Sequence, residues 1–152
     1  MRSFQLNIFI DRPLQEVYNH IAEPINMIGL QPLLTSIEIL KEQKDADGII
    51  LRPYYTVETL RWLGLPVMRN RIYIVIHLTR PPSELEFHLF SKPDVQMTFG
   101  YSLRESEKGQ THLVQKVSSA KINKLLENIV FDHAIKNQRA MLANLKVRLE
   151  KS

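Results

Sequence analysis

The chain has no cysteine, only five glycines in 152 residues, and no apolar run of about 18 residues or more. The lack of cysteine excludes disulfides, thiolate nucleophiles and metal centres with cysteine ligands, and it is typical of a reducing compartment. The lack of long apolar runs predicts no membrane-spanning helix. The N-terminal segment alternates apolar and polar residues, unlike a signal peptide. We therefore expect a cytoplasmic protein.

The motifs of several enzyme classes are also missing. The sequence has no Gly-x-Ser-x-Gly, no phosphate-binding loop and no dinucleotide fingerprint. Its five histidines form no His-x-His or His-x-x-x-His pair, which are common arrangements of metal ligands. We expect no metal and no other cofactor, and no catalytic residue can be named from a motif.

The charge is slightly positive, with 20 basic and 16 acidic residues and a net charge of +4. The segment 52–80 contains five arginines and one acid, Glu58. Basic segments are found in proteins that bind nucleic acids or anionic membranes. However, the chain has no block of five or six like charges and no nucleic-acid-binding motif. We therefore expect no nucleic-acid partner.

The order of elements follows from changes in hydrophobic period. Alternation predicts a strand over 4–10, and apolar residues at i, i+3, i+4 and i+7 predict a helix over 14–21. A second short helix is expected over 25–30. Six further strands, separated by turn residues, are predicted at 34–43, 49–62, 67–79, 84–90, 95–104 and 111–119. A helix over 122–150 ends the chain, which shows no repeat or linker and is expected to be a single domain over 1–152.

Short turns between the strands predict an antiparallel sheet. One register places the apolar residues of all seven strands on the same face, and its main pairs are Val57–Ile72, Tyr55–Ile74, Ile76–Phe87, Ile74–Leu89, Phe87–Phe99, Leu85–Tyr101, Leu103–Leu113, Tyr101–Gln115 and Phe99–Val117. A slip of one residue would move a strand's apolar residues to the other face. The long final helix is expected to cover the apolar face.

Two stretches of sequence resemble a known superfamily. One is Ile-Asp-Arg-Pro-Leu-Gln-Glu-Val-Tyr at 10–18, followed by Gly-Leu-Gln-Pro-Leu-Leu at 29–34; the other is Arg-Ala-Met-Leu-Ala-Asn-Leu-Lys-Val-Arg-Leu-Glu at 139–150. With the element order, they resemble the helix-grip superfamily of START lipid-transfer domains, the birch pollen allergen and polyketide cyclase/dehydrase-like proteins. The resemblance implies an α+β fold, in which a seven-stranded antiparallel sheet wraps around a long C-terminal helix, with two short helices between strands 1 and 2. It also implies a deep cavity between sheet and helix, but no catalytic residue.

Polar residues on the predicted apolar face favour a ligand cavity over a solid core, because burying polar groups without partners is unfavourable. In the predicted register and helix stripe, these residues are Tyr55, Thr59, Asn70, Tyr101, Gln115, His133 and Asn137. The apolar contacts to a ligand would come from Val57, Ile72, Ile74, Phe87, Phe99 and Val117. The structural alternative is that the polar groups bond one another or buried water.

These patterns favour a protein that binds or carries a hydrophobic or amphipathic small molecule, such as a lipid, an isoprenoid or a polyketide. An alternative is a cyclase- or dehydratase-type enzyme acting on such a ligand, in which His133 would be the candidate general acid or base. The sequence places no carboxylate on the inner face to assist it. A protein-interaction module is a second alternative.

The predicted hairpin tip at 60–71 is unusually apolar for a turn, and three arginines flank its apolar residues. Trp62, Leu63, Leu65 and Met68 are candidates for the entrance of the cavity. Tryptophan is favoured at membrane interfaces, and arginine is attracted to anionic lipids. We predict contact with a membrane surface here; packing of the tip on its own helix and a homodimer are the alternatives.

Overall fold

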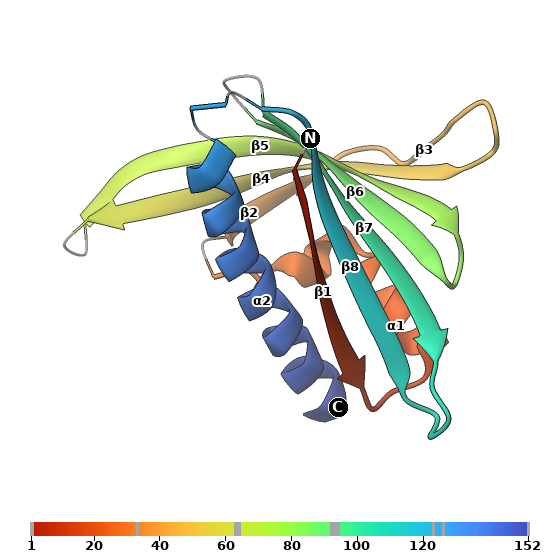
Figure 1. Ribbon diagram of the computed structural model, residues 1–152. Coiled ribbons are helices and arrows are strands. Elements are labelled where there is room, and N and C mark those ends of the chain that lie inside the picture. Colours follow the sequence, from red (N-terminus) through yellow and green to blue (C-terminus); the bar gives the residue numbers. More distant parts are fainter. Residues whose placement is uncertain are drawn as a thin grey trace.

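A large antiparallel sheet forms the body of the molecule (Figure 1). The computed structural model describes residues 2–32, 34–62, 65–91, 95–122, 124–125 and 127–151, and within these it describes the side chains of all residues except 58–70. The strands are β1 (Ser3–Ile10), β2 (Leu34–Ile39), β3 (Gln43–Lys44), β4 (Ile50–Trp62), β5 (Leu65–Arg80), β6 (Glu84–Ser91), β7 (Val95–Glu105) and β8 (Thr111–Lys121).

Two short helices and one long helix complete the fold. Helix α1 (Leu14–Ile21) and the 3-10 helix η1 (Pro24–Met27) connect β1 to β2, and α2 (Glu127–Lys151) follows β8. The expected α+β element order is therefore confirmed. The strand expected over 34–43 is instead two strands, β2 and the short β3, both of which pair with β4. No helix in the described part of the chain is long and apolar enough to cross a membrane.

The sheet places the first and last strands of the chain side by side. Its strand order is β1-β8-β7-β6-β5-β4-β2, with β3 pairing beside β4, and every neighbouring pair is antiparallel. Because β1 lies next to β8, the first strand is beside the last, and α2 runs alongside them (Figure 1). The helix therefore follows the β1 edge of the sheet.

The predicted register is confirmed across β5 to β8. Ile76 pairs with Phe87, Phe87 with Phe99, and Tyr101 with Gln115. The side chains of these residues are buried, whereas their neighbours in sequence on each strand are more exposed. Strict alternation of apolar and polar residues determines the register here, because a slip of one residue would exchange the two faces.

The predicted register between β4 and β5 is wrong by one residue. Tyr55 pairs with Tyr73 and Val57 with Arg71, rather than with the isoleucines one position further along. The physical reason is that β4 carries large apolar side chains on both faces, so its pattern does not select one face. The turn is also shorter than the expected four residues, since pairing continues to Trp62 and Leu65 with an irregularity after Leu60.

Hydrogen bonds hold α2 against β1 near both ends of the strand. The Lys146 Nζ donates to the Phe9 carbonyl oxygen at 2.6 Å, and the Arg12 Nε donates to the Leu149 carbonyl oxygen at 2.7 Å. At the other end, the Arg2 guanidinium donates to Asn128 Oδ1 at 2.7 Å. The three bonds therefore attach α2 to β1 and to residues just before and after it.

The C-terminal end of α2 holds η1 and the residue that follows it. The Arg148 guanidinium donates to the carbonyl oxygens of Asn26 (2.6 Å) and Ile28 (2.8 Å). Gly29 lies between Ile28 and the buried Leu30, and its φ of 86° is in the left-handed region. A Cβ atom at this position would lie 2.7 Å from Arg148 Nη2. Glycine is therefore required both by the backbone conformation and by the close approach of Arg148.

Candidate functional site

A cluster of polar side chains lies inside the otherwise apolar space between the sheet and α2. Gln115 on β8 donates from Nε2 to Tyr101 Oη on β7 at 2.9 Å and to Gln138 Oε1 on α2 at 2.8 Å. The exposed fraction is 0% for Gln115 and 3% for Gln138 and Tyr101. With Tyr54 on β4, these residues form what we call the interior polar cluster. It links the sheet to the helix through hydrogen bonds rather than through apolar contact alone.

Two atoms of the interior polar cluster are buried without a hydrogen-bond partner. They are Tyr54 Oη and Gln115 Oε1, and Tyr54 is fully buried. Burial raises the pKa of Tyr54 well above its ordinary value, and the nearby Tyr101 contributes to the same shift. Burial also raises the pKa of Tyr101, although its hydrogen bond with Gln115 acts in the opposite direction. Both phenols are therefore neutral near pH 7 and act as hydrogen-bonding groups rather than as bases.

Apolar side chains surround this cluster on the sheet. The predicted residues Ile72, Ile74, Phe87, Phe99 and Val117 are all buried, as are Tyr101 and Gln115. The ring of Phe87 contacts that of Tyr101 edge-on, with 5.3 Å between centroids. The inward placement of these seven residues is thus confirmed. Their role in binding a ligand remains a proposal.

Two predicted site residues, Tyr55 and Val57, lie on the outer face of the sheet, so their assignment to the cavity is wrong. Tyr55 packs against Tyr73 with 5.1 Å between ring centroids, and the guanidinium of Arg71 lies 3.8 Å above its ring. Arg71 is itself exposed and pairs with Glu38 at 2.9 Å. The one-residue register difference explains this result, because it turns Tyr54 and Thr56 inward in place of their neighbours.

The face of α2 that packs on the sheet also differs from the prediction. His133 is exposed and Asn137 is only half-buried, so His133 does not line the interior. The buried stripe is instead formed by Phe131, Ala134, Gln138, Met141, Leu142, Leu145 and Leu149. The physical reason is that α2 has apolar residues around much of its circumference, and the predicted stripe included Ile129, which is 68% exposed. The inward polar group of the helix is Gln138.

Sequence reasoning missed five buried polar residues of the interior: Tyr54, Thr56, Thr111, Ser119 and Gln138. A signal for Gln138 was present, since it lies at helical spacing from Phe131, Ala134, Met141 and Leu145. Tyr54 and Thr56 had no comparable signal, because both faces of β4 are apolar. The predicted site residues Thr59 and Asn70, and the predicted entrance residues Trp62, Leu63, Leu65 and Met68, lie outside the residues whose side chains the structure describes.

Comparison with solved structures identifies the architecture. A protein from Thermus thermophilus is 14% identical, with a TM-score of 0.74 over 99% of this chain and 98% of that one. A START superfamily protein from Mycobacterium smegmatis is 11% identical, with a TM-score of 0.72 over 98% and 97% of the two chains. The Zhui aromatase/cyclase from a Streptomyces species is 15% identical, with a TM-score of 0.69 over 97% and 95%.

The chain has the START-like helix-grip fold. No protein-family profile and no curated protein matches it in sequence. At these low identities, the similarity concerns the path of the backbone. The chemistry of the site must therefore be argued from this chain's own side chains.

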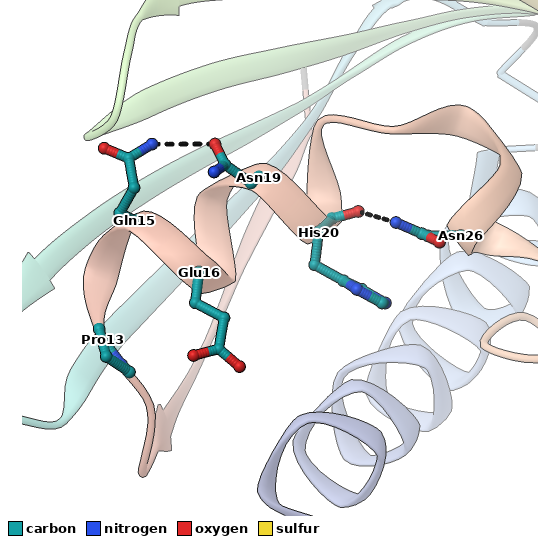
Figure 2. A pocket seen from close by; sticks show the side chains of 6 residues that line it. All are labelled: Pro13, Gln15, Glu16, Asn19, His20 and Asn26. Carbon is teal, nitrogen blue, oxygen red and sulfur yellow. Dashed lines mark hydrogen bonds between the residues drawn. The ribbon is translucent and has the colours of Figure 1, made fainter. Parts of the chain in front are cut away.

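One pocket of this helix-grip fold lies on the surface along α1 rather than between the sheet and α2 (Figure 2). Its lining residues are Pro13, Gln15, Glu16, Asn19, His20 and Asn26. Gln15 Nε2 donates to Asn19 Oδ1 at 2.9 Å, and Asn26 Nδ2 donates to the His20 carbonyl oxygen at 3.0 Å. Partial burial, and then the nearby Arg148, lower the pKa of His20. This polar lining does not fit the hydrophobic ligand that the sequence predicts.

The interior offers little for acid–base or metal chemistry. Among the described side chains, the buried polar residues other than tyrosine are Thr56, Thr111, Gln115, Ser119 and Gln138. None of these is a carboxylate, a histidine or a lysine. Within the described ranges, no group of three histidine or acidic residues is placed to hold a metal ion. The groups found in the interior can donate and accept hydrogen bonds, and the tyrosines can polarise a carbonyl.

Proposed function

We propose that this protein binds or carries a hydrophobic or amphipathic small molecule in the interior between the sheet and α2. The observation that supports this most is the interior polar cluster, in which hydrogen-bonding groups are enclosed by apolar side chains from β5 to β8 and from α2. A few oriented polar groups in an apolar enclosure are typical of small-molecule sites. The fold supports the proposal too, since a START superfamily protein and an aromatase/cyclase share it.

A cyclase-type enzyme is the second candidate, favoured by the similarity to the Zhui aromatase/cyclase and by the two neutral tyrosines, which can polarise a carbonyl. Such a reaction also needs a group that accepts a proton. The described interior contains none, and His133, the residue expected to provide one, is exposed. Binding without turnover is therefore the better supported function.

Native mass spectrometry of the purified protein tests the function directly. We expect a small-molecule adduct that disappears after denaturing extraction with organic solvent. After extraction and refolding, we expect the protein to bind diphenylhexatriene, a hydrocarbon whose fluorescence rises in an apolar site. A control with an exposed substitution, His133→Ala, should bind the probe equally well. Absence of both the adduct and probe binding would contradict the proposal.

Contact with a membrane through the hairpin at 60–71 is a further part of the proposal. Its support is the sequence, in which arginines flank apolar residues that include the chain's single tryptophan. We expect the wild-type protein to co-sediment with liposomes containing anionic lipid, because each basic residue near such a surface contributes about 1 kcal/mol. The Trp62→Ala/Leu65→Ser variant should co-sediment less.

The control for this experiment uses liposomes of neutral lipid, to which binding should be weaker. If the wild type and the double variant both fail to bind anionic liposomes at low and high salt, the membrane contact is wrong. A dimer that dissociates in the double variant would instead indicate that the hairpin forms an interface between two copies of the chain.

A further inference from the structure

The two unpartnered atoms of the interior polar cluster show which hydrogen bonds the interior does not make. Buried polar atoms in proteins are nearly always hydrogen-bonded, so each exception calls for an explanation. Two other buried side-chain atoms without a partner, on Ser106 and His112, lie in the β7–β8 turn and on the outer face beside Phe9. Among the described residues, the buried atoms without a partner on the inner face are therefore Tyr54 Oη and Gln115 Oε1.

Gln115 Oε1 can only accept a hydrogen bond, whereas the Tyr54 hydroxyl can both donate and accept. The neutral Tyr54 hydroxyl has a proton to donate. The Gln115 amide nitrogen donates one hydrogen to Tyr101 and one to Gln138. Its oxygen is therefore left as an acceptor with no donor. Of the inner-face atoms that have no hydrogen-bond partner, Tyr54 Oη can therefore donate and Gln115 Oε1 can accept.

The surroundings of these atoms carry no charge. In the part of the chain with described side chains, no buried residue is acidic or basic. Arg52, two residues before Tyr54 on β4, is already paired with Glu23 (3.0 Å) and Glu42 (2.9 Å). A carboxylate or phosphate placed in this interior would lose its hydration without gaining a counter-charge, which is strongly unfavourable.

We propose that the polar end of the ligand is an uncharged group that both accepts and donates a hydrogen bond, such as an alcohol or a primary amide. Its oxygen accepts from Tyr54 Oη, and its O–H or N–H donates to Gln115 Oε1. The ligand thereby completes the hydrogen bonding of both side chains. This inference rests on the proposed function and adds to it the chemistry of the ligand's polar end.

Chain-matched ligands test the inference. Diphenylhexatriene, which has no polar group, serves as the fluorescent probe, and dodecanol, dodecanamide, methyl dodecanoate and dodecanoate at pH 8 compete with it below their micellar concentrations. We expect the alcohol and the amide to bind about fivefold to tenfold more tightly than the ester, which accepts but does not donate. The carboxylate should be the weakest competitor, since its charge would be buried without a partner.

Two matched tyrosine variants test the donor. Tyr54→Phe removes a hydroxyl that has no partner, and Tyr18→Phe removes one that donates to the Glu84 carbonyl oxygen at 3.0 Å. Tyr54→Phe should weaken alcohol, amide and ester binding about fivefold to tenfold without changing affinity for diphenylhexatriene. Tyr18→Phe should change none of these affinities. In the ligand-free protein, Tyr54→Phe should raise Tm and Tyr18→Phe should lower it.

The outcomes separate the inference from the function on which it rests. If the protein binds neither diphenylhexatriene nor any competitor, both are overturned. If it binds the probe but the four competitors bind equally, or Tyr54→Phe leaves the alcohol's affinity unchanged, the inference is overturned and the proposed function stands. A fall in Tm for ligand-free Tyr54→Phe would show that the hydroxyl already has a partner, and this also would overturn the inference.

Discussion

Replacing Phe131 with alanine is expected to lower the free energy of unfolding by about 3–5 kcal/mol, the usual effect of removing a large buried ring. Phe131 is 0% exposed in the first turns of α2. Its ring packs edge-on against Phe4 of β1, with 5.9 Å between centroids, and the guanidinium of Arg2 lies 5.0 Å from its centre. Urea denaturation followed by circular dichroism measures the effect.

The matched control is Ile129→Ala, two residues earlier on the same helix. Ile129 is 68% exposed, so its truncation should change the unfolding free energy by no more than about 0.5 kcal/mol. The pair tests which side of α2 packs on the sheet. If Ile129→Ala is the more destabilising change, α2 contacts the sheet through the stripe that contains Ile129 and His133, and the interior polar cluster would lose Gln138.

The sequence was sufficient for the strands from β5 to β8 because each of them has one apolar and one polar face. On β7, for example, Met97, Phe99, Tyr101 and Leu103 are buried and alternate with more exposed residues. Several such strands joined by short turns leave only one register that keeps every apolar face on the same side. The pairing of Tyr101 with Gln115, and hence half of the interior polar cluster, followed from this pattern.

The rest of the site could not be predicted, because β4 and α2 lack a single apolar face. On β4, Tyr54 is fully buried and Tyr55 packs on the outer face, although the two residues are identical and adjacent. Only the pairing with β5 distinguishes them. On α2, apolar residues lie around much of the circumference, so the helical period alone did not select the buried stripe that contains Gln138. In both elements tertiary contacts select the face, and these are not visible in local sequence.

The interior polar cluster combines these two kinds of residue. Tyr101 and Gln115 lie on strands whose register is determined by the alternation of apolar and polar residues. Tyr54 and Gln138 lie on β4 and α2, where tertiary packing determines which side of the element faces the interior. Burying a glutamine side chain on a helix is unfavourable unless another buried group hydrogen-bonds to it. Gln115 is that partner for Gln138, on the stripe that also buries Phe131, Met141, Leu142, Leu145 and Leu149.

The hydrogen bond between Gln115 and Gln138 is therefore expected to make substitutions at the two positions non-additive. Gln115→Leu removes both hydrogen bonds and leaves Gln138 Oε1 without its donor, and we expect it to lower the free energy of unfolding by about 1–3 kcal/mol. Gln138→Leu removes the bond between the two glutamines and leaves one buried N–H of Gln115 without its acceptor, so it should also cost about 1–3 kcal/mol. In the double variant no stranded Gln138 oxygen remains, so its total cost should be about 1 kcal/mol smaller than the sum of the single costs.

Urea denaturation of the wild type, both single variants and the double variant measures this coupling. The control cycle combines Gln115→Leu with Tyr18→Phe, whose hydroxyl bonds to the Glu84 carbonyl oxygen and shares no partner with Gln115. Its costs should add to within about 0.5 kcal/mol. Additive costs in the Gln115–Gln138 cycle as well would mean that the two side chains do not interact in solution. The polar link between β8 and α2, around which the proposed ligand site is built, would then be absent.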